Sequence, residues 1–319
     1  MNLARLLHGV ARRLPEQPAI AVGDSVLLSY RDLSRRAARL AAAMVGKFQL
    51  QPGERVALAM KNCPQYWEVL FACWHAGLTA VPMNAKLHPK EFEYILGNAG
   101  ARVCFLTPGI ECAFENSVVT GSKDYEHLDA EAQSPAETKP GDPAWLFYTS
   151  GTTGVPKGAM LTHRNLLFAA QAYFADIDKL SPHDAILHPA PLSHGSGLYG
   201  VPHFAAGAVN VIPESGGFDA AEIFDLMDRW PNASFFAAPT MVVRLLASPA
   251  ARTPAGLKTI TYGGAPMYVA DALRAIELFG PRLYQLFGQR SIRSKISAAS
   301  KPPLSGITLT APAAKCGTP

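Results

Sequence analysis

Short apolar runs alternate along this chain with segments whose apolar residues recur at helical spacing. Such runs are typical of buried strands, and their alternation with helices is typical of parallel sheets covered by helices. Strands are expected at residues 55–60, 79–81, 102–106, 144–148, 185–187, 209–212, 234–237 and 259–262. Helices are expected at residues 65–76, 89–96, 220–230, 241–246 and 268–279. The sequence therefore predicts an α/β fold of two stacked βαβ subdomains with mostly parallel sheets.

Local signals place several helix ends. Ser29 and Asp32 have the spacing of a capping box before a helix with one apolar face. Thr162 is expected to cap a further helix, which extends to Ile177. Pro89 is expected to begin a helix that Gly97 ends. Residues 1–15 are interpreted as a surface helix.

Two segments differ in composition from the rest. Residues 107–143 are rich in Pro, Glu and Ser, and we expect them to join the two subdomains. Residues 290–319 contain four prolines, no acid and no aromatic residue, and they show no strand or helix period. The sequence therefore predicts one folded domain over residues 1–289 and an unrelated basic, disordered tail over 290–319.

Composition excludes several classes of protein. With 49% hydrophobic and 17% charged residues, the 319-residue chain can bury a large core. The net charge of +4 comes from five basic residues after Gln289, without which 24 Lys and Arg stand against 25 Asp and Glu, so no nucleic-acid partner is predicted. No apolar run reaches the roughly 18 residues of a membrane span. Five cysteines without a C-x-x-C pair favour reduced thiols in a cytoplasmic protein.

The segment from Trp145 to Gly158 carries the strongest chemical signal. Its apolar half is expected to be a strand, and its second half, from Thr149, to be a loop with four hydroxyls, three glycines and Lys157. Glycines let backbone N–H groups converge on an anion, hydroxyls donate further hydrogen bonds, and Lys157 supplies positive charge. A polar surface turn is the simpler interpretation of such a segment. A Walker loop is excluded because Pro156, and not glycine, precedes Lys157.

This segment closely resembles the phosphate-binding loop of the adenylate-forming enzymes, which include acyl-CoA synthetases, luciferases and the adenylation domains of peptide synthetases. The resemblance implies the N-terminal domain of that fold. It also implies that the loop holds the β- and γ-phosphates of ATP while a carboxylate attacks the α-phosphate. The residues that would bind ATP here are Thr149, Ser150, Gly151, Thr152, Thr153, Gly154 and Lys157.

Three later segments extend the resemblance. Residues 191–195 resemble the family segment at the acyl pocket, which implies that His194 gates the carboxylate as the catalytic residue. Residues 262–266 resemble a turn that lines the adenine and the acyl group. Residues 284–289 resemble the start of the aromatic-Gly-x-Thr-Glu motif, in which Phe287 would stack on adenine. The nucleotide-binding residues implied by the last two segments are Gly263, Gly264, Ala265, Pro266, Phe287, Gly288 and Gln289.

The resemblance stops after Gln289. The family motif continues with a small or hydroxyl residue and a glutamate for Mg²⁺, but this chain has Arg290 and Ser291. A cation at that position opposes binding of Mg²⁺. The later ribose-binding aspartate and the C-terminal lysine are also missing. We therefore expect a truncated or frame-shifted product that is not a competent ligase.

The function implied by the resemblance is acyl-CoA synthesis from a fatty or aryl carboxylic acid, ATP and coenzyme A, with Mg²⁺ required. A non-catalytic nucleotide-binding fragment is a second hypothesis. A third is an NAD oxidoreductase, because Gly195, Gly197 and Gly200 match G-x-G-x-x-G, but nearby prolines argue against the strand and helix that this fingerprint requires. The histidines lack zinc-ligand spacing, so no metal site is predicted.

Overall fold

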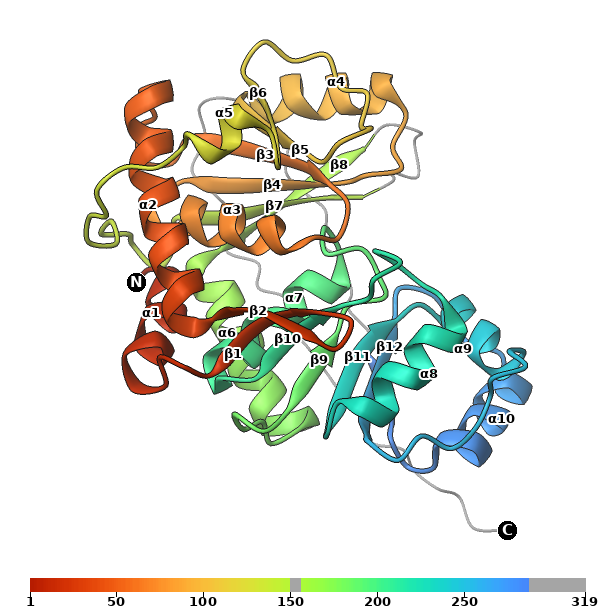
Figure 1. Cartoon of the computed structure of the whole chain (residues 1–319). Coiled ribbons are helices and arrows are strands. Elements are labelled where there is room, and N and C mark those ends of the chain that lie inside the picture. Colours follow the sequence, from red (N-terminus) through yellow and green to blue (C-terminus); the bar gives the residue numbers. More distant parts are fainter. Residues whose placement is uncertain (150–155, 287–319) are drawn as a thin grey trace.

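The computed structural model describes residues 1–149 and 156–286 and contains two sheets, one above the other in Figure 1. The upper sheet has six strands in the order β6-β5-β3-β4-β7-β8. These strands are β3 (Arg55–Met60), β4 (Thr79–Asn84), β5 (Ala101–Leu106), β6 (Ser117–Val119), β7 (Pro143–Thr149) and β8 (Lys157–Thr162). All neighbouring strands are parallel except β7 and β8.

The lower sheet has seven strands in the order β13-β12-β11-β9-β10-β1-β2. They are β1 (Pro18–Val22), β2 (Ser25–Ser29), β9 (Ala185–Leu187), β10 (Val209–Ile212), β11 (Ala233–Ala237), β12 (Leu257–Gly263) and β13 (Leu283–Leu286). Only the β1–β2 pair is antiparallel. Two mostly parallel sheets with covering helices confirm the predicted fold class.

Helices separate and cover the two sheets (Figure 1). They are α1 (Ala4–Arg13), α2 (Tyr30–Phe48), α3 (Pro64–His75), α4 (Pro89–Ala99), α5 (Lys123–Glu126), α6 (His163–Ala172), α7 (Gly195–Ala206), α8 (Ala220–Arg229), α9 (Pro239–Leu246) and α10 (Val269–Phe279), with a π-helix over Tyr173–Ile177. The expected surface helix in residues 1–15 is α1, whose Leu7 and Val10 are buried in the core between the sheets.

One hydrophobic core is shared by the facing sides of both sheets. In β3, Val56 and Leu58 belong to this shared core, whereas Ala57 and Ala59 belong to a separate cluster on the side covered by α4. This alternation follows from the two-residue period of a strand. Every residue of α3 from Tyr66 to His75 is buried, so α3 lies inside the shared core.

The prediction that residues 107–143 join the two subdomains is wrong. These residues connect β5 to β7 and include β6 and α5, so the segment begins and ends in the upper sheet. The chain instead enters the upper sheet through α2 and returns to the lower sheet through α6 and the π-helix. The segment of residues 107–143 is therefore a long connection within the upper sheet, and it includes the edge strand β6.

The predicted helix caps are confirmed, with one exception. The Ser29 hydroxyl accepts a hydrogen bond from the Asp32 amide at 3.1 Å, and Thr162 accepts one from the Asn165 amide at 3.1 Å. The predicted end of α4 at Gly97 is wrong, because the helix continues to Ala99 and ends at Gly100, whose φ is +60°. The helix ends where Gly100 adopts the left-handed conformation. Gly97 lies within the last turn and does not end the helix.

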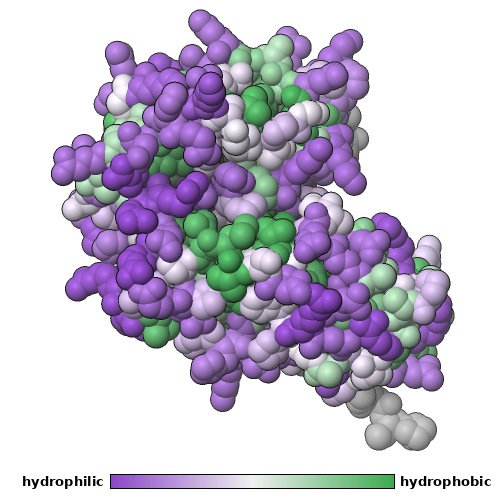
Figure 2. All heavy atoms as spheres, in the orientation of Figure 1, coloured by the Kyte–Doolittle hydropathy of each residue, from purple (hydrophilic) through white to green (hydrophobic). Residues whose placement is uncertain are grey.

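The β1–β2 hairpin was not predicted from the sequence. β2 forms the edge of the lower sheet, and its Val26 and Leu27 side chains are about half exposed. Figure 2 shows hydrophobic side chains gathered on this face over the hairpin. Edge strands with exposed apolar residues lack the inward-facing alternation on which strand prediction depends.

Two histidines lie fully buried around α7. His188 Nδ1 lies 2.8 Å from Ser196 Oγ and its Nε2 lies 2.9 Å from Asn210 Oδ1. His203 contacts the Tyr199 carbonyl at 2.7 Å and Ser234 Oγ at 2.9 Å. Burial lowers the pKa of each imidazole to about 3. Both rings therefore remain neutral and serve as hydrogen-bonded packing elements.

These lowered pKa values predict a loss of stability in mild acid. Because the unfolded histidines titrate near 6.5 and the folded ones near 3, protons bind the unfolded chain more readily. The free energy of unfolding should therefore fall by about 1.4 kcal/mol per pH unit for each histidine as the pH drops below 6.5. Urea unfolding between pH 6.5 and about pH 5 measures this slope.

The matched comparison is between His188→Gln and His183→Gln, since His183 is exposed. His188→Gln should make the pH slope smaller, and His183→Gln should leave it unchanged. An unchanged slope in the His188 variant would contradict the assignment.

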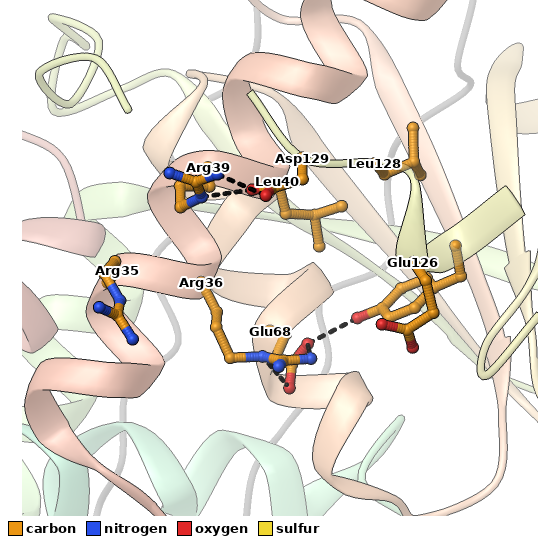
Figure 3. A pocket seen from close by; sticks show the side chains of 9 residues that line it. Arg35, Arg36, Arg39, Leu40, Glu68, Glu126, Leu128 and Asp129 are labelled. Carbon is orange, nitrogen blue, oxygen red and sulfur yellow. Dashed lines mark hydrogen bonds and ion pairs between the residues drawn. The ribbon is translucent and has the colours of Figure 1, made fainter. Parts of the chain in front are cut away.

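An ion pair between a buried carboxylate and a partly exposed arginine connects α2 and α3, and a tyrosine of α5 joins it (Figure 3). The Glu68 carboxylate is 4% exposed and accepts a hydrogen bond from Arg36 Nη2 at 3.0 Å, and Arg36 Nε lies 3.0 Å from its other oxygen as an ion-pair contact. The Tyr125 hydroxyl donates to the same carboxylate at 2.7 Å. Nearby, Arg39 forms a two-bond ion pair with Asp129, but both side chains are substantially exposed.

The two ion pairs should differ in their effect on stability. Glu68→Ala leaves the Tyr125 hydroxyl buried without its acceptor, so the free energy of unfolding should fall by about 1–3 kcal/mol. Asp129→Ala removes only a solvent-screened pair, and no measurable loss is expected. Urea denaturation of both variants measures this difference. Equal losses in the free energy of unfolding would show that the Glu68 contacts stabilise the fold no more than the exposed Arg39–Asp129 pair does.

Candidate functional site

The predicted phosphate loop connects the two strands of a hairpin. β7 ends at Thr149 and β8 begins at Lys157, and these two residues are paired across the strands. Lys157 therefore lies in a strand and not in the predicted loop. Ser150, Gly151, Thr152, Thr153 and Gly154 lie outside the described residues.

Gly158 also belongs to β8 and packs closely against the paired strand. A Cβ atom at Gly158 would lie 2.9 Å from Cζ of Tyr148 on the paired strand. The missing side chain therefore gives space to the Tyr148 ring, whose hydroxyl donates to Asn98 Oδ1 at 2.6 Å. Burial raises the pKa of Tyr148 to about 12, so the hydroxyl stays neutral.

His194 lies at the N-terminal end of α7, after the segment that follows β9. Its amide donates to the Pro191 carbonyl at 3.1 Å, and its Nδ1 lies 2.9 Å from Ser193 Oγ. The imidazole also makes an edge contact with the Phe147 ring of β7, with the ring centres 5.5 Å apart. These contacts place His194 beside the strand that ends at Thr149.

A cavity of about 170 Å³ brings these residues together. Its wall includes His194, Thr149 and Pro156, so the predicted gate and both ends of the predicted phosphate loop share one space. Asn84 at the end of β4 and Glu91 on α4 complete the polar part of the wall. In parallel sheets, ligands bind beyond the carboxyl ends of the strands, which is where this cavity lies.

Asn62 fixes the segment that carries His194. Its Nδ2 donates to the carbonyls of His188 at 2.8 Å and Ala190 at 2.9 Å, and its Oδ1 accepts from the Leu192 amide at 2.9 Å. The hydroxyl of Tyr66 also donates to the Leu192 carbonyl at 3.0 Å.

Neither Asn62 nor Asn84 was predicted from the sequence. The signal was available, because each is a polar residue at or just beyond the carboxyl end of a parallel strand. Their role in positioning the segment and the cavity wall depends on the pairing of distant strands, which the sequence alone did not reveal.

The predicted adenine turn follows β12. Gly263 pairs with Leu286 of β13, and a Cβ atom at Gly263 would lie 2.7 Å from the Leu286 carbonyl oxygen. Gly264 has a φ of +88°, and Gly264, Ala265 and Pro266 are exposed. These residues do not line the cavity beside His194.

The other half of the predicted adenine site follows β13, the neighbouring parallel strand. Phe287, Gly288 and Gln289 come directly after its last residue, Leu286, and lie outside the described residues. Their predicted roles therefore stay predictions.

The G-x-G-x-x-G match has a packing role. Contrary to the argument from nearby prolines, it does open a helix, because α7 begins at Gly195 and contains Pro202. Added Cβ atoms would lie 2.6 Å from the Phe236 ring at Gly195, 2.0 Å from the Leu192 carbonyl oxygen at Gly197, and 2.4 Å from the Trp67 ring at Gly200. The three glycines thus admit close neighbours, and they do not support NAD binding.

A larger cavity of about 340 Å³ lies elsewhere, beside the Arg36–Glu68 ion pair (Figure 3). It shares no lining residue with the cavity at His194. Because Arg36 and Arg39 are already paired with carboxylates, we do not assign it to the functional site.

Residues 1–149 and 156–286 contain neither a cluster of metal ligands nor a membrane-spanning helix. No group of three His, Cys, Asp or Glu side chains in this part of the chain could hold a metal ion. No helix there is both long and apolar enough to cross a membrane.

Comparison with known proteins identifies relatives over most of the chain. The family model described as "AMP-binding enzyme" matches residues 7–293. Feruloyl-CoA synthase of Amycolatopsis sp is 34% identical over 277 residues, which cover 84% of this chain and 55% of the relative. The fatty acid–[acyl-carrier-protein] ligase ScoC of Streptomyces coeruleorubidus is 29% identical over 296 residues, which cover 87% of this chain and 56% of the relative. The chain thus spans about half the length of the curated relatives it matches.

Solved structures of related proteins resemble this chain as well. ATP-bound MatB of Rhodopseudomonas palustris superposes with a TM-score of 0.78 at 25% identity, covering 90% of this chain and 60% of that protein. The N-terminal domain of FACL13 from Mycobacterium tuberculosis, at 23% identity and a TM-score of 0.77 over 91% of this chain and 75% of that one, shares the fold. These findings confirm the resemblance indicated by the residues from Trp145 to Gly158. The chain belongs to the family of AMP-binding enzymes.

Proposed function

We propose that this chain carries the nucleotide and acid sites of an ATP-dependent acid–CoA ligase. In that reaction a carboxylate attacks the α-phosphate of ATP, pyrophosphate leaves, and coenzyme A then takes the acyl group as a thioester. The observation that carries the proposal is the cavity that places His194 beside Thr149 and Pro156, the ends of the predicted phosphate loop. Membership of the AMP-binding family supports it.

The phosphate site is proposed to lie in the β7–β8 hairpin. Lys157 is held by strand pairing opposite Thr149, at the first residue of β8. Lys157 supplies positive charge to the β- and γ-phosphates, and the hydroxyls supply hydrogen bonds. The assigned residues are Thr149, Ser150, Gly151, Thr152, Thr153, Gly154 and Lys157.

The adenine is proposed to bind between the ends of β12 and β13. Gly263 and Leu286 are paired in this sheet, so the parallel strands β12 and β13 end at the same edge. Phe287 offers a ring face for stacking, and the glycine turn offers backbone groups. This edge is the one at which parallel sheets bind ligands.

The acid is proposed to enter beside His194. The ring is positioned by Ser193 and by Phe147, and its location between the phosphate hairpin and α7 suits a group that orients a carboxylate. An aryl acid is the first candidate, because feruloyl-CoA synthase is among the relatives. Fatty acids remain the alternative, as ScoC is described as a fatty acid ligase.

A second proposal concerns competence of the chain itself. Arg290 and Ser291 stand where the family motif has a hydroxyl residue and the glutamate that binds Mg²⁺. The described residues offer no substitute cluster of metal ligands. We therefore propose that the chain binds nucleotide and acid but does not complete the reaction with Mg²⁺ and coenzyme A.

Calorimetric titration with ATP, ferulate, benzoate and a fatty acid, followed by an assay for thioester formation, tests both proposals. We expect ATP and one class of acid to bind, and no thioester to form. Thioester formation would contradict the second proposal only. Failure of ATP to bind would contradict the first proposal and the nucleotide binding that the second assumes.

Lys157→Ala should weaken ATP binding more than AMP binding, because AMP lacks the β- and γ-phosphates. The expected loss for ATP is about 1.5–3 kcal/mol, the size of a hydrogen bond to a charged group. Calorimetric titration of both nucleotides measures it, with the surface variant Lys123→Ala as the control. Equal weakening of ATP and AMP would reject the assignment.

His194→Ala should weaken binding of the carboxylic acid and leave ATP affinity nearly unchanged. The reason is that His194 faces the cavity while the phosphate groups are held by the hairpin. His183→Ala is the matched control, since His183 is exposed. If ATP affinity fell as far as acid affinity, His194 would be a packing residue and not the gate.

A further inference from the structure

Two cysteines, Cys104 and Cys112, meet on the face of the upper sheet that is covered by α4. Cys104 lies in β5 and is fully buried, and Cys112 is partly exposed. Cys112 packs against the hydrophobic cluster to which Cys104 belongs. Both are free thiols in this structure.

The chain path explains why they meet. After Leu106 the chain leaves the sheet and returns at β6, where Ser117 pairs with Cys104 itself. The Cys104 amide donates to the Asn116 carbonyl at 2.9 Å, which closes the loop. Cys112 lies in the middle of this closed loop, and the loop folds back over the cluster.

The two thiols pack in one cluster and affect each other's titration. The neighbouring Cys112 and burial raise the pKa of Cys104, and the neighbouring Cys104 lowers the pKa of Cys112. Cys112 is therefore the thiol of the pair that loses its proton more readily, and it is also the more accessible one. Cys63 differs, because burial raises its pKa to about 12. Reactive cysteines are those with a stabilised thiolate and access to solvent.

We propose that Cys104 and Cys112 form a reversible disulfide when the protein meets hydrogen peroxide. The Cys112 thiolate attacks one peroxide oxygen, which gives a sulfenic acid and, with a proton, one water molecule. The Cys104 sulfur then attacks the Cys112 sulfur, and the displaced hydroxide takes the Cys104 proton and leaves as the second water. One peroxide is reduced and two thiols are oxidised, so atoms and electrons balance.

The cross-link would fasten the loop of residues 107–116 to β5. The same hydrophobic cluster contains Met83, Ile95 and Tyr148, which line the cavity beside His194. The modification thus lies in a cluster that also supports the candidate site. It is independent of the proposed function, because it requires only the two thiols and an oxidant.

The test is peptide mapping by mass spectrometry after exposure of the folded chain to one equivalent of hydrogen peroxide. We expect a peptide linked through Cys104 and Cys112 that dithiothreitol separates, and Cys112 should react at least about tenfold faster than Cys63. The Cys316→Ser variant removes the one cysteine that lies outside the described residues. The Cys63→Ser variant is the matched control, because it removes a cysteine that is not expected to form the link. Both should still form the link, whereas Cys112→Ser should not.

Cys104→Ser provides a second measurement. In this variant Cys112 should stop at the sulfenic acid, which dimedone traps. Two results in the wild-type chain would overturn the proposal. One is a link from Cys112 to Cys316 in place of Cys104, and the other is oxidation of Cys112 to sulfinic acid without any link.

Discussion

Three hydrogen bonds made by Asn62 connect the two halves of this molecule at the candidate site. Asn62 follows β3 of the upper sheet, and all three bonds go to the backbone of residues 188–192, which follow β9 of the lower sheet. A backbone segment between a strand and a helix has polar groups that must be satisfied. A single side-chain amide satisfies three of them and thereby sets the position of His194 relative to the β7–β8 hairpin.

The shared core makes that connection possible. Trp67 and Trp145 are completely buried between the sheets, and Gly197 and Gly200 of α7 leave room for their rings. Close packing of aromatic rings on a glycine-rich helix brings the lower sheet against α3, and α3 in turn lies beneath the upper sheet. The His188 contacts with Ser196 and Asn210 then fix the start of α7 from below.

Local sequence signals predicted the elements that depend on local physics. The expected strand over residues 55–60 matches β3, and the caps at Ser29 and Thr162 are present. α7 was missed because Gly195, Gly197 and Pro202 disfavour a helix, and the rings that stabilise it come from distant segments. The β1–β2 hairpin and the path between the sheets were also missed, because both depend on long-range strand pairing. At the site, residue types indicated the phosphate hairpin and His194, but Asn62 and Asn84 required the topology.

The central claim is that the phosphate hairpin and His194 belong to one site. Its most direct test is NMR of the chain with ¹³C-labelled histidine rings, with the His194 signal assigned from a His194→Gln variant. Addition of ATP should shift the His194 signal and leave exposed His183 unchanged, and Asn62→Ala should reduce the shift. Binding of ATP without any change at His194 would contradict the claim.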